Sequence, residues 1–579
     1  MLEKMKMEEE FDPEVIIEEF EALSKDAERV QKETLKKILT ENGESEYLLV
    51  RCGLGRRTDP ENFKACVPLV THADLDPYIQ RIADSTEPIC VLTGKPITTI
   101  SLSSGTTGGK PKFVPFNDGL MEITVLMYKT SFAYRNREYP IEEGKALQFI
   151  YSSMQFKTAG GLAAGTSTTN VYRHPLFKPT MQALHAPCCS PDAVIFGPDF
   201  RQSSYCHLLL ALVSRCQIQL IASTFAFTIV HAFRSFEIDW QNLVADIRHG
   251  RLPAARITAP GIRAAVSELL GPNPELADEI HRACAAAASR NWYGIIPAVF
   301  PNAKYVYAIM TGSMEPYIGK LRQYAGDLPL VAGDYGASEG WIGANIRPKR
   351  PPESVTFVVR PDIGYFEFIP MNDEEESSCP VGLTEVEIGR EYEVVITNVA
   401  GLYRYKLGDI VKIKGFHNST PELEFVCRKN VVLTINMDKN TEKDLQIATE
   451  EAARVLTAEK YEVVDFTSRV DFSTEPAHYV IFWEVSGDPA EELLQECCNC
   501  LDMAFKDAGY VSSRKVNTIG ALELKVMKKG TFQKIMDHYI GLGAVVSQFK
   551  TPRCVGADNT AVLGILCGNA VKTFFSTAF

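Results

Sequence analysis

The sequence predicts an α/β fold: a large N-terminal domain of mixed sheets and helices, then a small α+β C-terminal domain. Strand-like runs alternate with helical stretches from residue 90 to about 430, a pattern typical of α/β architectures. After Lys429-Asn430 shorter strands and helices fill about 150 residues, which is near the common size of one domain. We therefore expect two domains, residues 1–430 and 431–579.

The N-terminal elements follow from local patterns. Asp12 can cap a helix whose first turn accepts Pro13, and apolar residues recur along one face from Ile16 to Ile38. This pattern predicts one helix that ends at Asn42-Gly43 and packs on the main body rather than forming a coiled coil. Further along, we expect strands at 100–102, 147–151, 305–307 and 393–396, and helices at 117–134 and 260–290.

The C-terminal elements are equally compact. We expect strands at 461–466, 478–485 and 522–526, and helices at 490–508 and 532–542. The second-last helix carries Cys497, Cys498 and Cys500, one Cys-x-x-Cys pair without a second pair or a nearby histidine. Buried helix thiols are therefore favoured over zinc ligands. In the large domain, the acidic run 372–378 is interpreted as a solvated loop.

Composition limits the function classes. The 579 residues are 45% hydrophobic and 23% charged, with a formal charge of -13 that disfavours a nucleic-acid partner. The most apolar stretch, 205–233, is interrupted by Arg215, Gln217 and Gln219, so we expect core rather than a membrane span. The N-terminus lacks the pattern of a signal peptide, and fifteen cysteines suit a reducing compartment. These features predict a cytoplasmic protein that has no membrane contact.

The first chemical motif follows the strand at 100–102. Its glycines permit close approach of an anion, its hydroxyls and N–H groups can surround phosphate oxygens, and its lysines add positive charge. The spacing is not that of a Walker loop, and a flexible surface loop is the alternative interpretation. The candidate phosphate-binding residues are Ser101, Ser103, Ser104, Gly105, Thr106, Thr107 and Lys110.

The second motif, 334–341, follows the apolar run 328–332, at the end of a strand where open α/β sheets bind ligands. Tyr335 could stack on a base, and Glu339 could hold Mg²⁺ beside phosphates. By itself the motif favours a structural turn with Tyr335 in the core.

The third motif, 398–409, supplies Asp409, which could accept hydrogen bonds from a ribose, and Arg404, which could contact phosphate. A hairpin with its turn at Gly408-Asp409 explains the pattern equally well. The basic segment 548–553 is, from its own residues, a surface turn.

In this order the three motifs resemble those of the acyl-adenylate-forming enzymes. An extra residue before Pro111 and the replacement of a glycine by Phe113 distinguish the chain from the acyl-CoA ligases. With NWYG at 291–294, TGSMEPY at 311–317 and the C-terminal FFSTAF, the whole chain resembles the plant Gretchen Hagen acyl acid amido synthetases, and most closely their jasmonate-conjugating members.

The resemblance implies adenylation of a carboxylic acid by ATP with Mg²⁺, followed by attack of an amino acid on the acyl adenylate. It implies catalytic roles for Ser103, Lys110 and Lys550, and rotation of the small domain between the two steps. Tyr335 would flank the adenine, and Asp409 would hold the ribose. Gly336, Ser338 and Glu339 would lie near phosphate and metal, with Glu339 as the metal ligand.

The resemblance also implies an acyl site. Some relatives carry a histidine where this chain has Gly333, which puts the choice of acid in question. Jasmonate with isoleucine is favoured, and indole-3-acetate with aspartate is the alternative. The altered first motif disfavours a CoA ligase, and the intact candidate residues disfavour a nucleotide-binding protein without catalysis. We expect a monomer. The implied acyl-site residues are Leu120, Thr124, Tyr128, Thr168, Val171, Ile309, Gly333 and Trp341.

Overall fold

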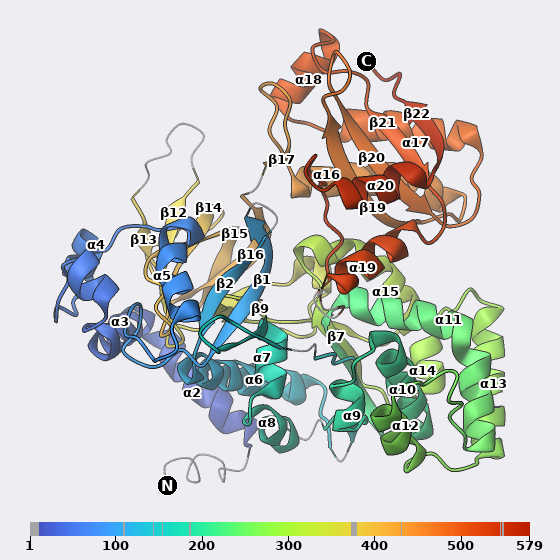
Figure 1. The fold of residues 1–579 in the computed structure, drawn as a ribbon, viewed down its shortest axis with the longest axis horizontal. Coiled ribbons are helices and arrows are strands. Elements are labelled where there is room, and N and C mark those ends of the chain that lie inside the picture. The colour runs from blue at the N-terminus through green and yellow to red at the C-terminus, as the bar shows by residue number, and fades with distance from the viewer. Residues whose placement is uncertain are drawn as a thin grey trace. The chain divides into compact units, whose positions relative to one another are not determined.

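The computed structural model divides the chain into two compact units (Figure 1). Unit 1 comprises residues 1–407 and 411–425, and unit 2 comprises residues 408–410 and 426–579. The expected α/β class with a large N-terminal and a small α+β C-terminal part is confirmed. The structure describes residues 11–107, 110–142, 144–152, 155–184, 187–371, 379–429, 431–542, 544, 546 and 549–579. The acidic run 372–378, expected to be a solvated loop, lies outside them.

The N-terminal helix is two helices rather than one. Asp12 caps α2 (Pro13–Lys25) through Glu14 N at 2.9 Å, as expected. The backbone leaves helical geometry at Asp26 (φ −131°, ψ 48°), and α3 (Ala27–Asn42) follows. The apolar stripe continues across this break, since Phe20, Ala27 and Val30 are all buried within unit 1.

A parallel sheet forms one core of unit 1. Its strands are β3 (Lys145–Gln148), β6 (Ile218–Phe225), β7 (Tyr305–Ile309) and β8 (Leu330–Ala332), side by side in that order. Helix α10 (Phe200–Val213) packs against β3, and α11 (Ala226–His249) packs against β6 and β7. The apolar stretch 205–233 therefore forms core, as expected, and no helix within the described residues is long and apolar enough to span a membrane.

Two further sheets complete unit 1. One contains, side by side, β2 (Lys110–Phe116), β1 (Thr99–Thr107), β5 (Ala163–Thr166) and β4 (Phe156–Lys157). The other has the strand order β13-β12-β14-β15-β16-β11-β10-β9. The strands of this second sheet are β9 (Tyr335–Ala337), β10 (Gly340–Ala344), β11 (Phe357–Val359), β12 (Tyr365–Pro370), β13 (Val381–Gly382), β14 (Glu391–Thr397), β15 (Tyr405–His417) and β16 (Thr420–Arg428).

Helices of widely different length make up much of the rest of unit 1. The stretch expected as one helix at 260–290 is two, because Gly271-Pro272 separates α12 from α13. The helical elements of unit 1 not yet named are η1 (Tyr47–Arg51), α4 (Pro60–Cys66), α5 (His72–Asp84), α6 (Asp118–Glu138), α7 (Ser167–Arg173), α8 (Phe177–Ala183), α9 (Asp192–Ile195), η2 (Arg215–Gln217), α12 (Pro260–Ser267), α13 (Pro274–Ala288), α14 (Ile295–Val299), η3 (Gly312–Tyr317), α15 (Ile318–Ala325) and η4 (Pro352–Ser354).

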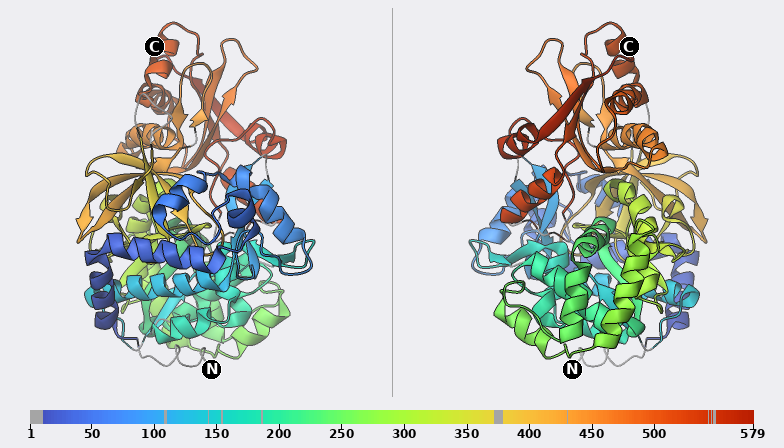
Figure 2. Two further views of the ribbon diagram at one scale, coloured as in Figure 1. Left: turned by 90° about the vertical axis from the view of Figure 1, so that its left-hand side faces the viewer. Right: turned by 90° about the vertical axis from the view of Figure 1, so that its right-hand side faces the viewer.

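Unit 2 is built on the sheet β19-β20-β21-β22 (Figure 2), and its core contains Trp483, Leu494 and Cys498. The strand expected at 478–485 is found at those bounds, and the cysteine-rich segment lies in a helix that buries Cys497 and Cys498, as expected. Its elements are β17 (Val431–Leu433), β18 (Asn440–Thr441), α16 (Glu442–Ala458), β19 (Val463–Asp471), β20 (His478–Val485), α17 (Glu491–Ala504), α18 (Ala508–Lys515), β21 (Glu523–Met527), α19 (Thr531–Gly541), α20 (Thr560–Gly568) and β22 (Ala570–Phe575).

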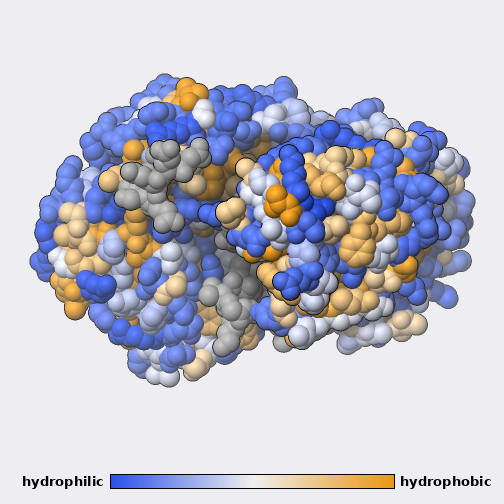
Figure 3. Space-filling model, turned by 90° about the horizontal axis from the view of Figure 1, so that it is seen from above, coloured by the Kyte–Doolittle hydropathy of each residue, from blue (hydrophilic) through white to orange (hydrophobic). Residues whose placement is uncertain are grey.

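The surface view in Figure 3 is largely hydrophilic, with scattered apolar residues. That distribution matches a chain with 23% charged residues.

Candidate active site

Two predicted acyl-site residues meet at the carboxyl ends of parallel strands. Ile309 ends β7, and Gly333 follows β8 directly. The Gly333 N–H donates to the Ala308 carbonyl at 2.6 Å, and a Cβ added at Gly333 would lie 3.1 Å from the Ile309 nitrogen. A side chain at position 333 would therefore require Ile309 to shift by a few tenths of an ångström.

Helix α6 carries three more of these residues, and two of them, Thr124 and Tyr128, contact the indole ring of Trp341. The Trp341 Nε1–H donates to Thr124 Oγ1 at 3.1 Å, and the Thr124 hydroxyl donates to the Leu120 carbonyl at 2.8 Å. Tyr128 meets Trp341 edge to face, with ring centroids 5.8 Å apart. Leu120 and Val171 are buried in the cluster that Tyr128 joins. Residues that are far apart in sequence therefore lie together in the fold.

The second motif forms a tight antiparallel hairpin, β9–β10, which contains the structural turn that the motif alone favours. Trp341 pairs with Gly336 across it, and a Cβ at Gly336 would lie 2.8 Å from Trp341 Cε3. A glycine is required here because the indole ring occupies the space that any side chain would fill. Ser338 and Glu339 form the turn, where Ser338 is half-buried.

Tyr335 and Glu339 face the interior of unit 1. The Tyr335 ring packs against Phe357 and Phe425, with centroids 5.5 and 5.9 Å away, which agrees with the core position that the motif alone favours. The Glu339 carboxylate accepts a hydrogen bond from the Tyr405 hydroxyl at 3.2 Å. The carboxylate is thereby oriented before any ligand is considered.

The first motif runs within the β1–β2 hairpin. The register shifts between Leu102 and Thr106, so Ser103 lies in a bulge, where it is nine-tenths buried. Ser101 is fully buried and accepts a hydrogen bond from the Asn170 amide at 3.1 Å, an internal contact. The side chains of the other predicted phosphate-binding residues lie outside the described part of the chain: Ser104, Thr106, Thr107 and Lys110, together with Gly105.

Thr168 lies in the first turn of α7, directly after β5. Its hydroxyl is 3.3 Å from that of Thr166, the residue that caps this helix through Thr169 N at 3.2 Å. Thr168 is half-buried, and the described part of the chain shows no contact between it and the residues around Trp341.

Arg404 corrects one expectation. Its Nε and Nη2 donate to the two oxygens of Glu367 at 2.9 Å each, and its Nη1 donates to the carbonyls of Lys64 and Val67 at 2.9 Å. The guanidinium is buried and engaged on all three nitrogens, so the arrangement supports a structural role in place of the expected phosphate contact. The alternative turn at Gly408-Asp409 is also wrong, because β15 passes through both residues.

Unit 2 brings Asp409 and Lys550 into one electrostatic environment. Arg428 Nε donates to Asp409 Oδ1 at 3.1 Å, and the carboxylate is buried. Burial and the charge of Arg428 lower the pKa of Lys550 to about 8, although Glu442 and Asp409 act in the opposite direction. A lysine of this kind changes charge near neutral pH, which is a common property of functional sites.

A buried polar group beside the predicted acyl site was not predicted from the sequence. Asp334 accepts from the Tyr307 hydroxyl at 2.8 Å and from Asn345 N at 2.9 Å, and Arg135 lies 3.8 Å from it. The Arg135 guanidinium stacks on the Tyr307 ring at 3.9 Å. A signal was present, since Arg135 follows Tyr128 by two helical turns on the same face of α6.

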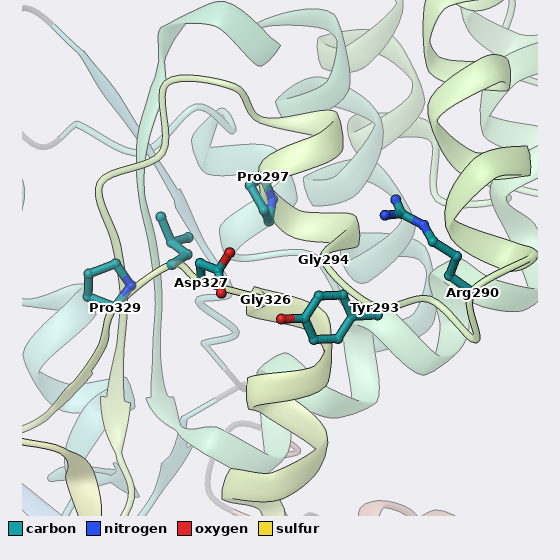
Figure 4. Close-up of a pocket in the computed structure, with 8 residues that line it drawn as sticks. Arg290, Tyr293, Gly294, Pro297, Gly326, Asp327 and Pro329 are labelled. Atoms are coloured by element: carbon teal, nitrogen blue, oxygen red, sulfur yellow. The ribbon is translucent and has the colours of Figure 1, made fainter.

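A surface cavity of about 380 Å³ lies elsewhere in unit 1 (Figure 4). Tyr293, Pro297 and Asp327 border it, and none of the predicted site residues lines it. We therefore do not place the chemistry there.

Three family models match successive parts of the chain. The GH3 family N-terminal domain matches residues 16–330, the GH3 family central domain residues 357–428, and the GH3 family C-terminal domain residues 443–559.

Individual proteins match nearly the full length. The jasmonoyl–L-amino acid synthetase JAR6 of Nicotiana attenuata is 66% identical and covers 99% of each chain. The indole-3-acetic acid-amido synthetase GH3.10 of Arabidopsis thaliana is 47% identical over 97% of this chain and 98% of its own. The solved structure of AtGH3.15 acyl acid amido synthetase in complex with 2,4-DB has a TM-score of 0.88, 35% identity and 98% coverage of both chains.

Proposed function

The chain belongs to the GH3 family, and from this premise we propose that it is an ATP-dependent ligase that adenylates jasmonate and joins it to an amino acid, with isoleucine favoured. The observation that supports this most is the convergence of Thr124 and Tyr128 on Trp341, which would form part of an apolar, aromatic acyl site in unit 1.

The reaction has two steps. A carboxylate oxygen of the acid attacks the α-phosphorus of ATP, forming an acyl adenylate and releasing pyrophosphate. The amino group of the amino acid then attacks the acyl carbon, loses a proton and releases AMP. Positive charge stabilises the phosphate oxygens in the first step, and Lys110 and Lys550 are the proposed sources. Ser103, with its neighbours in the first motif, would donate hydrogen bonds to the same oxygens.

ATP and Mg²⁺ fit the residues in different ways. Asp409 would accept hydrogen bonds from the ribose, and Tyr335 would border the adenine. Within the described residues no three metal-binding side chains gather. Magnesium is commonly held by one or two carboxylates plus phosphate oxygens, and Glu339 offers one carboxylate in a hairpin turn. Once bound there, the ion would neutralise phosphate charge.

The choice of acid rests on similarity and on lining chemistry. The greater identity to a jasmonoyl synthetase, 66% against 47% for an indole-3-acetic acid synthetase, supports jasmonate. One contact favours the alternative, indole-3-acetate with aspartate. The Thr124 hydroxyl already donates its proton to the Leu120 carbonyl, so it can only accept from a ligand, which suits an indole N–H better than a ketone.

The remaining features extend the same proposal. Residues 1–430 would form the adenylation domain, and residues 431–579 a mobile C-terminal domain that contributes Lys550. None of the fifteen cysteines, all of which the structure describes, is in a disulfide, and we propose a reducing, cytoplasmic location, which suits that state. We propose a monomer with no nucleic-acid or membrane partner, and light scattering of the purified chain tests the oligomeric state.

Pyrophosphate release tests the function. The purified chain is mixed with ATP, Mg²⁺ and either jasmonate or indole-3-acetate, each with isoleucine, aspartate, CoA or no acceptor, and products are identified by mass spectrometry. We expect acid-dependent release with jasmonate and an amide conjugate with isoleucine. Release with indole-3-acetate but not with jasmonate would show that the reaction is right and the acid is wrong. A thioester product would show that the acceptor is CoA rather than an amino acid. No release with either acid would refute the proposal.

A further inference from the structure

Lys550 stands beside two residues that are held by a single carboxylate. The Thr551 hydroxyl donates to Asp465 Oδ2 at 2.6 Å, and Arg553 Nη1 donates to Asp465 Oδ1 at 2.7 Å. All three side chains are at least 94% buried, and all three lie in unit 2. Each oxygen of Asp465 thus fixes one residue on the C-terminal side of Lys550.

A bulge in β19 accompanies this orientation of Asp465. Val463 pairs with Val485 but Asp465 pairs with Glu484, so Val464 is the extra residue of the pair of strands. Bulges commonly turn a side chain toward a new direction. Asp465 Oδ1 also accepts from Phe466 N at 2.9 Å, and Arg553 donates to the Phe466 carbonyl at 2.7 Å. The hydrogen bonds of the Asp465 carboxylate and its partners therefore fix their positions relative to one another.

The backbone after Lys550 is tied to the same strand. The Arg553 carbonyl accepts from Ser468 N at 2.9 Å and from the Ser468 hydroxyl at 2.6 Å, and Val555 N donates to the Ser468 carbonyl at 2.8 Å. These bonds hold residues 553–555 whether or not Asp465 is charged. What Asp465 adds is the attachment of Thr551, one peptide bond from Lys550.

We propose that Asp465 is a positioning residue for Lys550, and that its hydrogen bonds to Thr551 and Arg553 fix the segment from which the Lys550 ammonium reaches the reacting phosphate and carboxylate. This inference rests on the proposed function. A locked segment matters for such a group because a displacement of about 1 Å in a charged catalytic side chain costs up to about a hundredfold in rate.

The protonation of Lys550 depends on the same placement. Its pKa of about 8 reflects burial first and then the charge of Arg428, both of which change when the segment moves. Release of the segment into water would return the pKa toward the ordinary lysine range near 10. A shift in the pH profile is therefore a readout that loss of stability alone does not produce.

The test uses two substitutions and a matched control in the full-length chain. Thr551→Val removes one hydrogen bond and leaves the Asp465–Arg553 ion pair, whereas Asp465→Asn removes the charge. Asp471→Asn is the control, because Asp471 lies on the same strand and pairs with Arg469, and within the described residues 549–555 it bonds to none. For each variant we measure kcat and KM for ATP and acid in pyrophosphate release, the pH profile of kcat, and the unfolding temperature.

We expect Thr551→Val and Asp465→Asn to lower kcat about five- to fiftyfold, with KM for ATP within about twofold, and to move the alkaline decline of kcat upward by at least half a pH unit. Asp465→Glu should restore part of kcat, and Asp471→Asn should change only the unfolding temperature. Unchanged kcat and pH profile in Thr551→Val and Asp465→Asn would overturn the inference, as would an equal kcat loss in the control. If Lys550→Ala also keeps full activity, the role of Lys550 itself is wrong, whereas an inactive wild-type chain refutes the proposed function.

Discussion

Gly336→Ala probes the hairpin that carries Trp341. The added Cβ would lie 2.8 Å from Trp341 Cε3, whereas ordinary contacts of a Cβ begin near 3.4 Å, so the ring or the strand must move by about 0.6 Å. The ring has little freedom, since Thr124 holds Nε1 at 3.1 Å and Tyr128 borders its face. A shift of this size stretches that hydrogen bond beyond its normal range.

The expected cost follows from these contacts. Overpacking in a well-packed site costs about 1–3 kcal/mol, and a lost hydrogen bond about 1 kcal/mol. If about 1.4 kcal/mol of this falls on acid binding, KM for jasmonate rises about tenfold. KM for ATP should stay within about twofold, because the displaced ring contacts Thr124 and Tyr128 of α6, both in the proposed acyl site.

The assay is initial-rate pyrophosphate release against jasmonate concentration at saturating ATP, with Gly415→Ala as the matched control. Gly415 is also a strand glycine, and a Cβ there would meet no atom within 4 Å. Replacing Trp341 by Phe in the Gly336→Ala background should recover part of the lost affinity, since the smaller ring leaves room for the methyl group. The reasoning is refuted if KM for jasmonate is unchanged while KM for ATP rises, because Gly336 would then serve the nucleotide.

Three further substitutions test other parts of the site. Asp409→Ala should raise KM for ATP at least tenfold with little change in unfolding temperature, and a normal ATP titration would remove its ribose role. Because Lys550 has a pKa of about 8, its ammonium form is lost as pH rises, so kcat should fall about tenfold per pH unit above 8; Lys550→Arg should delay that fall beyond pH 10, and an unchanged profile would contradict it. Arg404→Leu should destabilise the chain by about 3–5 kcal/mol in urea unfolding, because Glu367 is left buried without its partner; a loss below about 1 kcal/mol would show that the pair is not needed.

The sequence pattern was sufficient to predict an element where its residues favour a single type of secondary structure. The apolar run His478–Val485, bounded by turn residues, is a strand in the structure at those residues. The break at Asp26 was missed because apolar spacing continues through it, so periodicity could not separate two helices from one.

The site was predictable in membership more than in arrangement. Thr124 and Trp341 are 217 residues apart, so spacing could suggest each as a pocket residue but not that they share a hydrogen bond. Arg404 illustrates the opposite failure. An arginine inside a nucleotide-motif segment resembles a phosphate ligand until the fold brings Glu367 beside it, and that partner lies on strand β12, 37 residues earlier in the chain.

Several residues of the predicted acyl site are also core residues, and this has a consequence for how substrate preference can change over evolutionary time. Leu120, Thr124 and Val171 are each at least 93% buried, and Tyr128 packs against two separate hydrophobic clusters. A mutation that admits a new acid therefore also removes or crowds core contacts, and it draws on a stability margin of only a few kcal/mol. The choice of acid can therefore change only where a second substitution restores the packing. Related chains that use different acids should then differ at these positions in correlated pairs.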